Sequence, residues 1–277
     1  ASKEVMNIFS EYTDLIEPLS LDEAFLDVTE NRMNTPSATI LAIEIKKKIL
    51  ERTGLTASAG VSYNKFLAKT ASEINKPDGI AVIKPDEAEV FLEKLPIGKF
   101  FGIGKVSEKK MISLGITNGL ELKATPLDRL VKHFGKTGRF YYDIVRGVDE
   151  RPVEPVRERK SYGREITLDE DILDIDRIHS ILNKIASELE ESLKRKKIRG
   201  KTITLKVKYH DFRQVTRSIT LNHYTDSAGI IIDNITNLIK LTEAGVKKVR
   251  LLGISLSHLD SSVGHQDEEI QLKLPCC

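Results

Sequence analysis

The chain has 277 residues, a length that fits two or three domains of typical size better than one. Its composition, 40% hydrophobic and 30% charged, is typical of a soluble globular protein, and no run approaches the roughly 20 consecutive apolar residues of a membrane span, which excludes an integral membrane protein. Residues 1–30 carry eight acids and one base, whereas residues 194–217 carry ten bases and one acid. This separation suggests that one end handles cations and the other a polyanion, although solvated helix and strand faces explain charge runs as well.

Residues 1–84 predict a small α/β unit. Apolar residues at helical spacing alternate with short strand-like runs, and Ser37 and Gly54 have the residue types that begin and end a helix. We expect helices over 3–12, 38–51 and 64–74, a hairpin-like stretch over 19–28, and strands over 56–62 and 80–83.

Residues 85–150 lack strand signals and predict short helices that alternate with glycine-containing turns. Residues 151–159 contain two prolines and charges of mixed sign without periodicity, which indicates an interdomain linker. The segment over 160–260 predicts a third folded part. Its elements follow a β-α-β-β-α-β order, the ferredoxin-like arrangement, with strands at 161–168, on both sides of the turn at 210–212 and at 249–256, and helices at 176–197 and 227–241.

The sharpest chemical signal is the adjacent pair Asp22 and Glu23 in an otherwise apolar hairpin. Two carboxylates in such a place are costly unless they are exposed or hold a cation. A strand turn that presents both suits Mg²⁺ bound together with substrate phosphates. A solvated Asp-Glu turn is the alternative that the dipeptide alone leaves open.

The sequence around this pair resembles the second carboxylate motif of the Y-family DNA polymerases, the translesion enzymes. The segments that carry the resemblance, in the family's order, are 17–29 (EPLSLDEAFLDVT), 55–62 (LTASAGVS), 65–71 (KFLAKTA) and 75–79 (NKPDG). The resemblance covers essentially the whole chain and implies a mixed α/β (α+β) fold: a partial ferredoxin-like palm over 1–84, a helix-hairpin-helix thumb over 85–150 and a little finger over 160–260.

This resemblance also implies chemistry. Asp22 would be a metal ligand and Glu23 the adjacent catalytic carboxylate, with two Mg²⁺ ions expected in the complete enzyme, and Lys76 would reach the incoming triphosphate. The reaction would transfer a nucleotidyl group from a deoxynucleoside triphosphate to the primer end of primer-template DNA. The resemblance further implies a monomer in the bacterial cytoplasm with no membrane partner. Ser20 would support the hairpin and is not expected to act as a nucleophile.

The chain departs from the family pattern at its beginning. The family's first palm strand, with another metal-ligating Asp, and its fingers domain are expected to be absent before Ala1, and we expect weakened or absent metal binding and no polymerisation by this chain alone. The alternative from another class is a non-catalytic module that binds DNA and a sliding clamp. A helix-hairpin-helix nuclease would need more acidic residues than Asp22 and Glu23 supply.

Two glycine-containing turns in the helical segment are candidate phosphate-binding sites. Phe101-Gly-Ile-Gly-Lys105 fits a helix-hairpin-helix turn, in which glycines let the backbone approach a phosphate and the next helix offers free N–H groups. Phe134-Gly-Lys-Thr-Gly138 looks like a second, degenerate copy. An ordinary tight turn is the alternative for either one alone. The candidate DNA-binding residues are Gly102, Gly104, Lys105, Val106, Gly135, Lys136 and Thr137.

Basic residues of the last folded part are further candidates for DNA contacts. A sheet with helices on one face can lay its other face against DNA and neutralise phosphates. A solubilising strand face is the alternative for any single residue. The candidates are Lys160, Ser161, Tyr162, Arg164, Arg213 and Arg217.

Residues 261–277 are expected to be a flexible tail. The resemblance implies that Gln271, Leu272 and Leu274 insert into a pocket of the sliding clamp, although Pro275 follows where the family peptide usually has an apolar pair. The only cysteines, Cys276 and Cys277, are adjacent at the end, which excludes a disulfide scaffold and a thiolate zinc site and indicates a reducing compartment.

Overall fold

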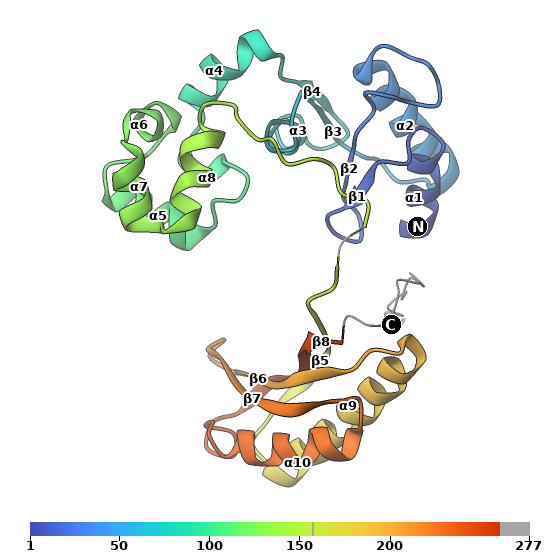
Figure 1. Ribbon diagram of the computed structural model, residues 1–277, viewed down its shortest axis with the longest axis vertical. Helices are drawn as coiled ribbons and strands as arrows, with labels where there is room; N and C mark the ends of the chain where they lie inside the picture. Colours follow the sequence, from blue (N-terminus) through green and yellow to red (C-terminus); the bar gives the residue numbers. More distant parts are fainter. Residues whose placement is uncertain (157, 261–277) are drawn as a thin grey trace. The chain divides into compact units, whose positions relative to one another are not determined.

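The computed structural model describes residues 1–156 and 158–260, and the chain divides between residues 157 and 158 into two compact units (Figure 1). We call them the N-terminal unit and the C-terminal unit. The expected mixed α/β fold is confirmed, and each unit contains both helices and strands.

The first part of the N-terminal unit forms the expected helices and strands within a few residues of their expected ends, except that the first hairpin strand lies at 16–18, before the expected stretch 19–28. Its elements are α1 (Ser2–Ser10), β1 (Ile16–Pro18), β2 (Ala24–Leu26), α2 (Ala38–Thr53), β3 (Ala59–Val61), α3 (Lys65–Ser72) and β4 (Ile80–Val82). β1 and β2 pair antiparallel, whereas β3 and β4 pair parallel. These four strands form two separate two-stranded sheets.

Local capping explains where the helices of this part begin and end. The side chain of Ser37 accepts a hydrogen bond from the backbone N–H of Ile40, and that of Asn64 accepts one from Leu67. Gly54 ends α2 with a φ of 70°, in the left-handed region that glycine adopts without strain. α2 buries its inner stripe against α1 in a small core of Ile8, Phe9, Tyr12, Leu41, Ile45 and Ile49.

The second part of the N-terminal unit is helical, as expected. It contains α4 (Pro85–Lys94), the 3₁₀ turn η1 (Ile97–Lys99), α5 (Lys105–Ser113), α6 (Gly119–Ala124), α7 (Leu127–Phe134) and α8 (Lys136–Ile144). The hydrophobic core does not break at the expected palm–thumb boundary after residue 84. Phe66 and Leu67 of α3 belong to the same buried cluster as Leu92 and Ile144, so α3 packs with the helical segment.

Gly138 allows α7 and α8 to pack closely. It is buried in α8, and a Cβ at this position would overlap the carbonyl oxygen of Leu130 in α7. Gly138 is therefore a packing residue, whereas the sequence suggested that it belongs to a phosphate-binding turn.

Residues 149–156 run back over the first part of the N-terminal unit, and we call them the strap. Asp149 accepts a hydrogen bond from the backbone N–H of Phe66 at 3.0 Å and a two-atom contact from Arg151 at 2.6 and 2.8 Å. Lys65 donates to the carbonyl oxygen of Pro152 at 2.8 Å. The first half of the expected linker is therefore held to the N-terminal unit.

The C-terminal unit has the β-α-β-β-α-β order that the sequence predicts. Its elements are β5 (Ser161–Ile172), α9 (Ile175–Lys196), β6 (Gly200–Tyr209), β7 (Gln214–Thr225), α10 (Ala228–Ile239) and β8 (Val249–Leu259). The strands form one antiparallel sheet in the order β5-β8-β6-β7. Each strand-helix-strand connection therefore skips one strand, the split β-α-β arrangement.

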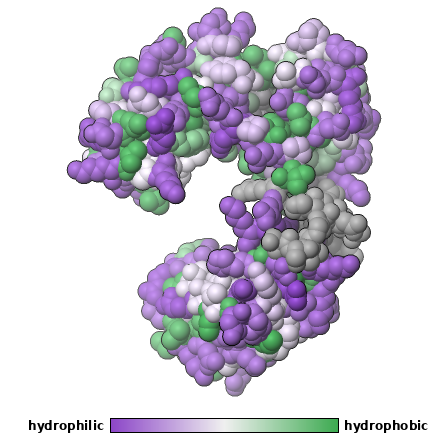
Figure 2. Space-filling model, viewed as in Figure 1, coloured by the Kyte–Doolittle hydropathy of each residue, from purple (hydrophilic) through white to green (hydrophobic). Residues whose placement is uncertain are grey.

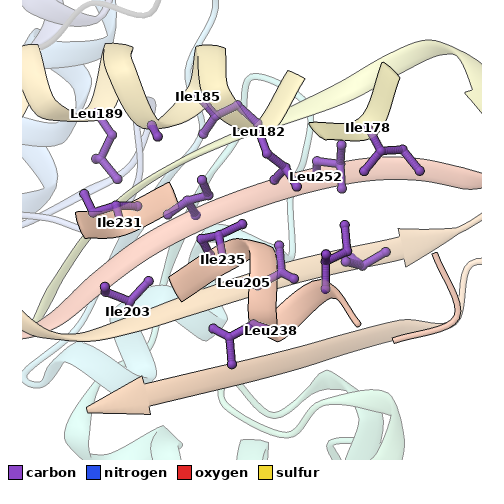
Figure 3. Close-up of a cluster of buried hydrophobic side chains, with 14 of the residues drawn as sticks. Ile178, Leu182, Ile185, Leu189, Ile203, Leu205, Ile231, Ile235, Leu238 and Leu252 are labelled. Carbon is purple, nitrogen blue, oxygen red and sulfur yellow. The ribbon is translucent and has the colours of Figure 1, made fainter. Parts of the chain in front are cut away.

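α9 and α10 cover one face of this sheet (Figure 1). The core lies between them: Leu182 and Ile185 of α9 and Ile235 of α10 face Leu205 and Leu252 of the sheet (Figure 3). The other face of the sheet is free of helices within the described part of the unit. This one-sided cover matches the alternation of apolar and polar residues in β6.

We expect Gly138→Ala to lower the free energy of unfolding of the N-terminal unit by about 1–3 kcal/mol, because the new methyl group forces α7 and α8 apart. Calorimetry or urea unfolding measures the change. The matched control is Gly229→Ala in α10, an exposed helical position whose nearest heavy atom to a Cβ lies 3.7 Å away. This control should raise stability by up to about 1 kcal/mol. Equal effects of the two substitutions would contradict the packing role.

We also expect the strap to be sensitive to acid through Asp149. Burial raises the pKa of this carboxyl, but the hydrogen bonds and charge of Arg151, with the N–H of Phe66, outweigh burial and hold the pKa below its usual range. Stability from this group is therefore present above the unfolded pKa of about 3.9 and is lost as pH falls through the lower folded value. Asp149→Asn should destabilise the N-terminal unit by about 2–4 kcal/mol at pH 7 and by much less near pH 3.

Urea unfolding at the two pH values measures this difference, with Asp14→Asn as the control. Asp14 pairs with Arg32 on the surface, so its substitution should cost less than about 1 kcal/mol. A cost for Asp149→Asn that does not change with pH would show that the charge is not the source of the stability.

Candidate functional site

The acidic pair lies in the tight turn between β1 and β2. The backbone N–H groups of Leu19 and Ser20 both donate to the carbonyl oxygen of Glu23, at 2.8 and 3.2 Å, which closes the turn. Ser20 Oγ donates to Asp22 Oδ1 at 2.5 Å and accepts from the N–H of Asp22 at 3.3 Å. Ser20 thus orients the Asp22 carboxylate, in agreement with its expected supporting role.

A chain of ion pairs connects this turn to Lys76. Lys69 Nζ lies 3.1 Å from Glu23 Oε1 and 2.7 Å from Glu73 Oε1, and Lys76 Nζ lies 2.7 Å from the same Glu73 oxygen. Sequence reasoning selected Glu23 and Lys76 but missed Lys69 and Glu73. The signal was present, because Lys69 and Glu73 are four residues apart, the spacing at which opposite charges meet along a helix.

The pKa values of the central pair favour its charged form. Burial disfavours the ammonium of Lys69, whose side chain is 14% exposed, but hydrogen bonds to Glu73 and Glu23 outweigh burial and raise its pKa. The same hydrogen bond and one from Lys76 lower the pKa of Glu73. Lys69 and Glu73 are therefore both charged at neutral pH, and an anion that approaches Lys76 must compete with Glu73.

A cavity of about 730 Å³ adjoins this network. Its charged lining includes Asp22, Glu23, Lys69 and Lys76, and its apolar lining comes from β2, α2 and β3. β2 pairs only with β1 and β3 only with β4, so each of the two strands has one edge without a partner strand among the described residues.

The carboxylates of Asp22 and Glu23 are of the donor type that Mg²⁺ prefers. Among residues 1–156 and 158–260, however, no three His, Cys, Asp or Glu side chains gather into a group that could hold a metal ion. Glu23 is also paired with Lys69. Asp22 and Glu23 would therefore hold Mg²⁺ only together with water and the phosphates of a substrate.

The first glycine turn has the geometry for a close backbone approach. Gly102 has a φ of +89°, and Gly104, the residue before α5, has open space where a Cβ would stand. Lys105 and Val106 follow at the start of α5 and are exposed, Val106 to 84%. The free N–H groups of this helix start are accessible to a phosphate.

The second glycine turn, at Gly135, resembles the turn at Gly102 and Gly104 only in part. Gly135 has a φ of +59° and separates α7 from α8, and Lys136 and Thr137 are exposed at the start of α8. These three positions remain predictions for DNA contact, whereas Gly138 is excluded by its buried packing role.

In the C-terminal unit, two of the candidate DNA-binding residues lie on the opposite face of the sheet from the one expected to meet DNA. Leu205 of the core pairs with Arg217 across the sheet, and Arg164 forms an ion pair with Glu188 of α9. Both arginines therefore lie on the helix-covered face. The two-residue period of a strand sets this face, and the sequence prediction did not apply the period to β5 and β7.

The prediction that the Tyr162 side chain contacts DNA does not fit its burial. Its ring is 6% exposed and belongs to the core, with Arg159 over it at 5.0 Å, so only the backbone of Tyr162 is available for DNA. Arg213 pairs with Glu243 at 2.7 Å, whereas Lys160 and Ser161 are exposed. The open face instead carries Lys206 and Lys208 from β6, together with Thr204, Thr216, Ser218 and Ser255.

Hydrophilic side chains cover much of the visible surface of both units (Figure 2). No helix within the described ranges combines the length and apolar character needed to cross a membrane. The expected clamp-binding residues Gln271, Leu272 and Leu274 lie outside the described residues, so their role stays a prediction.

Comparison with known proteins assigns the chain's family. The impB/mucB/samB family matches residues 1–73, its helix-hairpin-helix motif matches 85–116, and its C-terminal domain matches 159–274. The DNA polymerase IV of Clostridium perfringens (strain SM101 / Type A) is 48% identical over 268 residues, which cover 97% of this chain and 75% of that protein. The DNA polymerase IV of Bacteroides fragilis (strain YCH46) is 51% identical over 257 residues, covering 93% and 71%.

Solved structures agree. A Y-family DNA polymerase chimera of Dbh and Dpo4 has a TM-score of 0.78 at 29% identity, over 93% of this chain and 74% of the chimera. An insertion ternary complex of Dbh DNA polymerase has a TM-score of 0.59 at 28% identity, over 92% and 74%. The identity to these relatives over most of their length shows that the chain belongs to the Y family of DNA polymerases, the impB/mucB/samB family of DNA-directed translesion enzymes.

Proposed function

We propose that this chain supplies the acidic turn, the triphosphate lysine and the DNA-holding surfaces of a translesion polymerase that transfers a nucleotidyl group from a deoxynucleoside triphosphate to a primer end. The observation that carries the proposal is the ion-pair chain from Glu23 through Lys69 and Glu73 to Lys76, beside a cavity of about 730 Å³. It connects the carboxylates of the acidic turn with a lysine suited to a triphosphate.

Each residue of this network has a proposed task. Ser20 orients Asp22, and Lys69 holds Glu23 in the turn. Glu73 holds Lys76 until a triphosphate displaces it, since a phosphate chain carries more charge than one carboxylate. Bound Mg²⁺ would neutralise phosphate charge and lower the pKa of the attacking hydroxyl.

The other surfaces are suited to hold DNA without reading its sequence. The turn at Gly102 and Gly104 offers backbone N–H groups and the exposed Lys105 to phosphates. The open face of the C-terminal sheet adds Lys206 and Lys208 among small hydroxyl residues. Contacts of this kind fix position and depend strongly on salt.

We also propose that the 277-residue chain alone does not extend a primer. The number of carboxylates available to bind metal supports this proposal. The acidic turn offers two, and no group of three possible metal ligands forms among the described residues. A non-catalytic module that binds DNA and a sliding clamp is the second candidate, favoured by DNA-holding surfaces that are better formed than the metal site.

Titration of a fluorescent deoxynucleoside triphosphate with Mg²⁺ separates the two candidates. The polymerase proposal expects nucleotide binding that Lys76→Ala weakens by about tenfold, because one charged phosphate contact is lost. Lys47→Ala is the control, since Lys47 is exposed on α2 and pairs only with Glu51 among the described residues. In the same samples, primed template should remain unextended.

Nucleotide binding that is absent, or independent of both Mg²⁺ and Lys76, would favour the binding module. Robust primer extension by the unmodified chain would contradict the proposed inactivity.

We expect the glycine turn of the thumb to bind duplex DNA through phosphates. Lys105→Ala should weaken binding equally for unrelated duplex sequences and reduce the slope of log affinity against log salt by about 1, because one counterion fewer is released. Fluorescence anisotropy at several salt concentrations measures both, with Lys47→Ala as the control. A loss that depends on DNA sequence, or an unchanged slope, would oppose a phosphate contact.

A further inference from the structure

The turn between β6 and β7 places an aromatic residue where the backbone disfavours one. The N–H of Phe212 donates to the carbonyl oxygen of Tyr209 at 3.0 Å, and the N–H of Arg213 donates to Asp211 Oδ1 at 2.9 Å. These bonds close the turn without any contribution from the Phe212 ring. Phe212 has a φ of +65°, in the left-handed region that usually holds glycine or asparagine in such loops.

Burial does not compensate for this backbone conformation. Phe212 is 61% exposed, whereas the tyrosine that begins the same turn, Tyr209, is fully buried. A large side chain in a strained position, turned toward solvent, is a feature that folding alone does not explain. Strain of this kind is concentrated at binding sites.

Two cations lie close to the exposed ring of Phe212. Lys208 Nζ lies 5.0 Å and the Arg250 guanidinium 4.9 Å from the ring centroid. Arg250 stands at an irregularity in the pairing of β6 with β8, where two residues of β8 oppose one of β6. Asp171 Oδ1 lies 3.7 Å from a guanidinium nitrogen of Arg250, whereas Lys208 forms no ion pair with any residue that the structure describes.

We propose that Phe212 stacks on an unpaired base of single-stranded DNA next to the duplex, while Lys208 neutralises a neighbouring phosphate. This inference rests on the proposed DNA binding and assigns a further site to it. An aromatic ring beside cations at the end of a polar sheet is the combination that binds single-stranded nucleic acid, because every base offers a π face and every nucleotide a phosphate. A protein partner would more readily use an apolar surface without the uncompensated charge of Lys208.

Fluorescence anisotropy of the full 277-residue chain with three DNAs tests this site. The DNAs share one duplex and differ in the end: a 5′ overhang of thymidines, an abasic overhang of equal length, or a blunt end. We expect the unmodified chain to bind the thymidine overhang about tenfold more tightly than the abasic one. Phe212→Ala should abolish this preference and leave binding to the abasic and blunt DNAs unchanged.

Four further variants test whether the preference comes from stacking rather than from side-chain size or folding. Phe212→Tyr should keep the preference and Phe212→Leu should lose it, with unfolding temperatures that match the parent chain. Leu241→Ala is the matched control, because Leu241 is equally exposed, at 60%, but not aromatic. This control should keep the preference. Lys208→Met should weaken binding to both overhangs alike, since their phosphates are the same.

The proposal is overturned if the unmodified chain does not distinguish the two overhangs, if Phe212→Leu keeps the preference, or if Phe212→Ala weakens all three DNAs equally. The last result would assign Phe212 to the fold or to the duplex. If the chain binds none of the three DNAs, the proposed DNA binding fails as well, so the two failures are distinguishable.

Discussion

The ion pair between Lys65 and Glu17 is the interaction on which the arrangement of the N-terminal unit depends. Lys65 Nζ lies 2.6 Å from Glu17 Oε2 and also donates to the carbonyl oxygen of Pro152, with its side chain only 11% exposed. The same Glu17 oxygen accepts the N–H of Glu154 at 2.9 Å. Burial raises the pKa of Glu17, but these hydrogen bonds and the charge of Lys65 outweigh burial and lower it. Removal of either partner would leave a poorly solvated charge, which typically costs about 3–5 kcal/mol when the pair is fully buried.

This pair joins elements that are far apart in the sequence and close to the candidate site. Glu17 belongs to β1 and pairs with Phe25 of β2, on the two sides of the acidic turn. Lys65 begins α3, which carries Lys69 and leads to Glu73. Phe25 in turn contacts Phe101 edge-to-face at 6.4 Å, immediately before Gly102. The acidic turn, Lys76 and the first glycine turn are therefore positioned by one connected set of contacts.

The sequence predicted the features that depend on near neighbours. Ser37 and Gly54 indicated helix ends by local capping, and apolar residues at helical spacing indicated the helices of residues 1–84. Features that depend on pairing over long distances were not accessible. The contact between Asp149 and Phe66 spans more than eighty positions, and no periodicity encodes it. Gly138 was assigned to a turn because a glycine motif cannot distinguish a close helix contact from a phosphate contact.

The candidate site also combines residues that the sequence predicts with residues that only the structure reveals. Adjacent carboxylates and family motifs selected Asp22, Glu23 and Lys76, but the lysine and the glutamate that connect them required coordinates. In the C-terminal unit, net basic charge drew attention to Arg164 and Arg217, although strand period places both with the helices. Charge therefore selected the segment, and the two-residue period of the strands decided which of its residues face outward.

The open face of the C-terminal sheet is suited to many weak contacts with DNA that act together. Its small hydroxyl residues and glycine, such as Thr204, Ser218 and Gly253, keep the sheet surface low beside Lys206 and Lys208. A low, polar surface can lie along a phosphate backbone without base-specific contacts, which suits an enzyme that must hold DNA of any sequence. Each contact then contributes little. In the proposed DNA complex, affinity would be the sum of contacts at the thumb turn and on the sheet, and the exposed aromatic ring at the β6–β7 turn would add the one contact whose strength depends on an unpaired base.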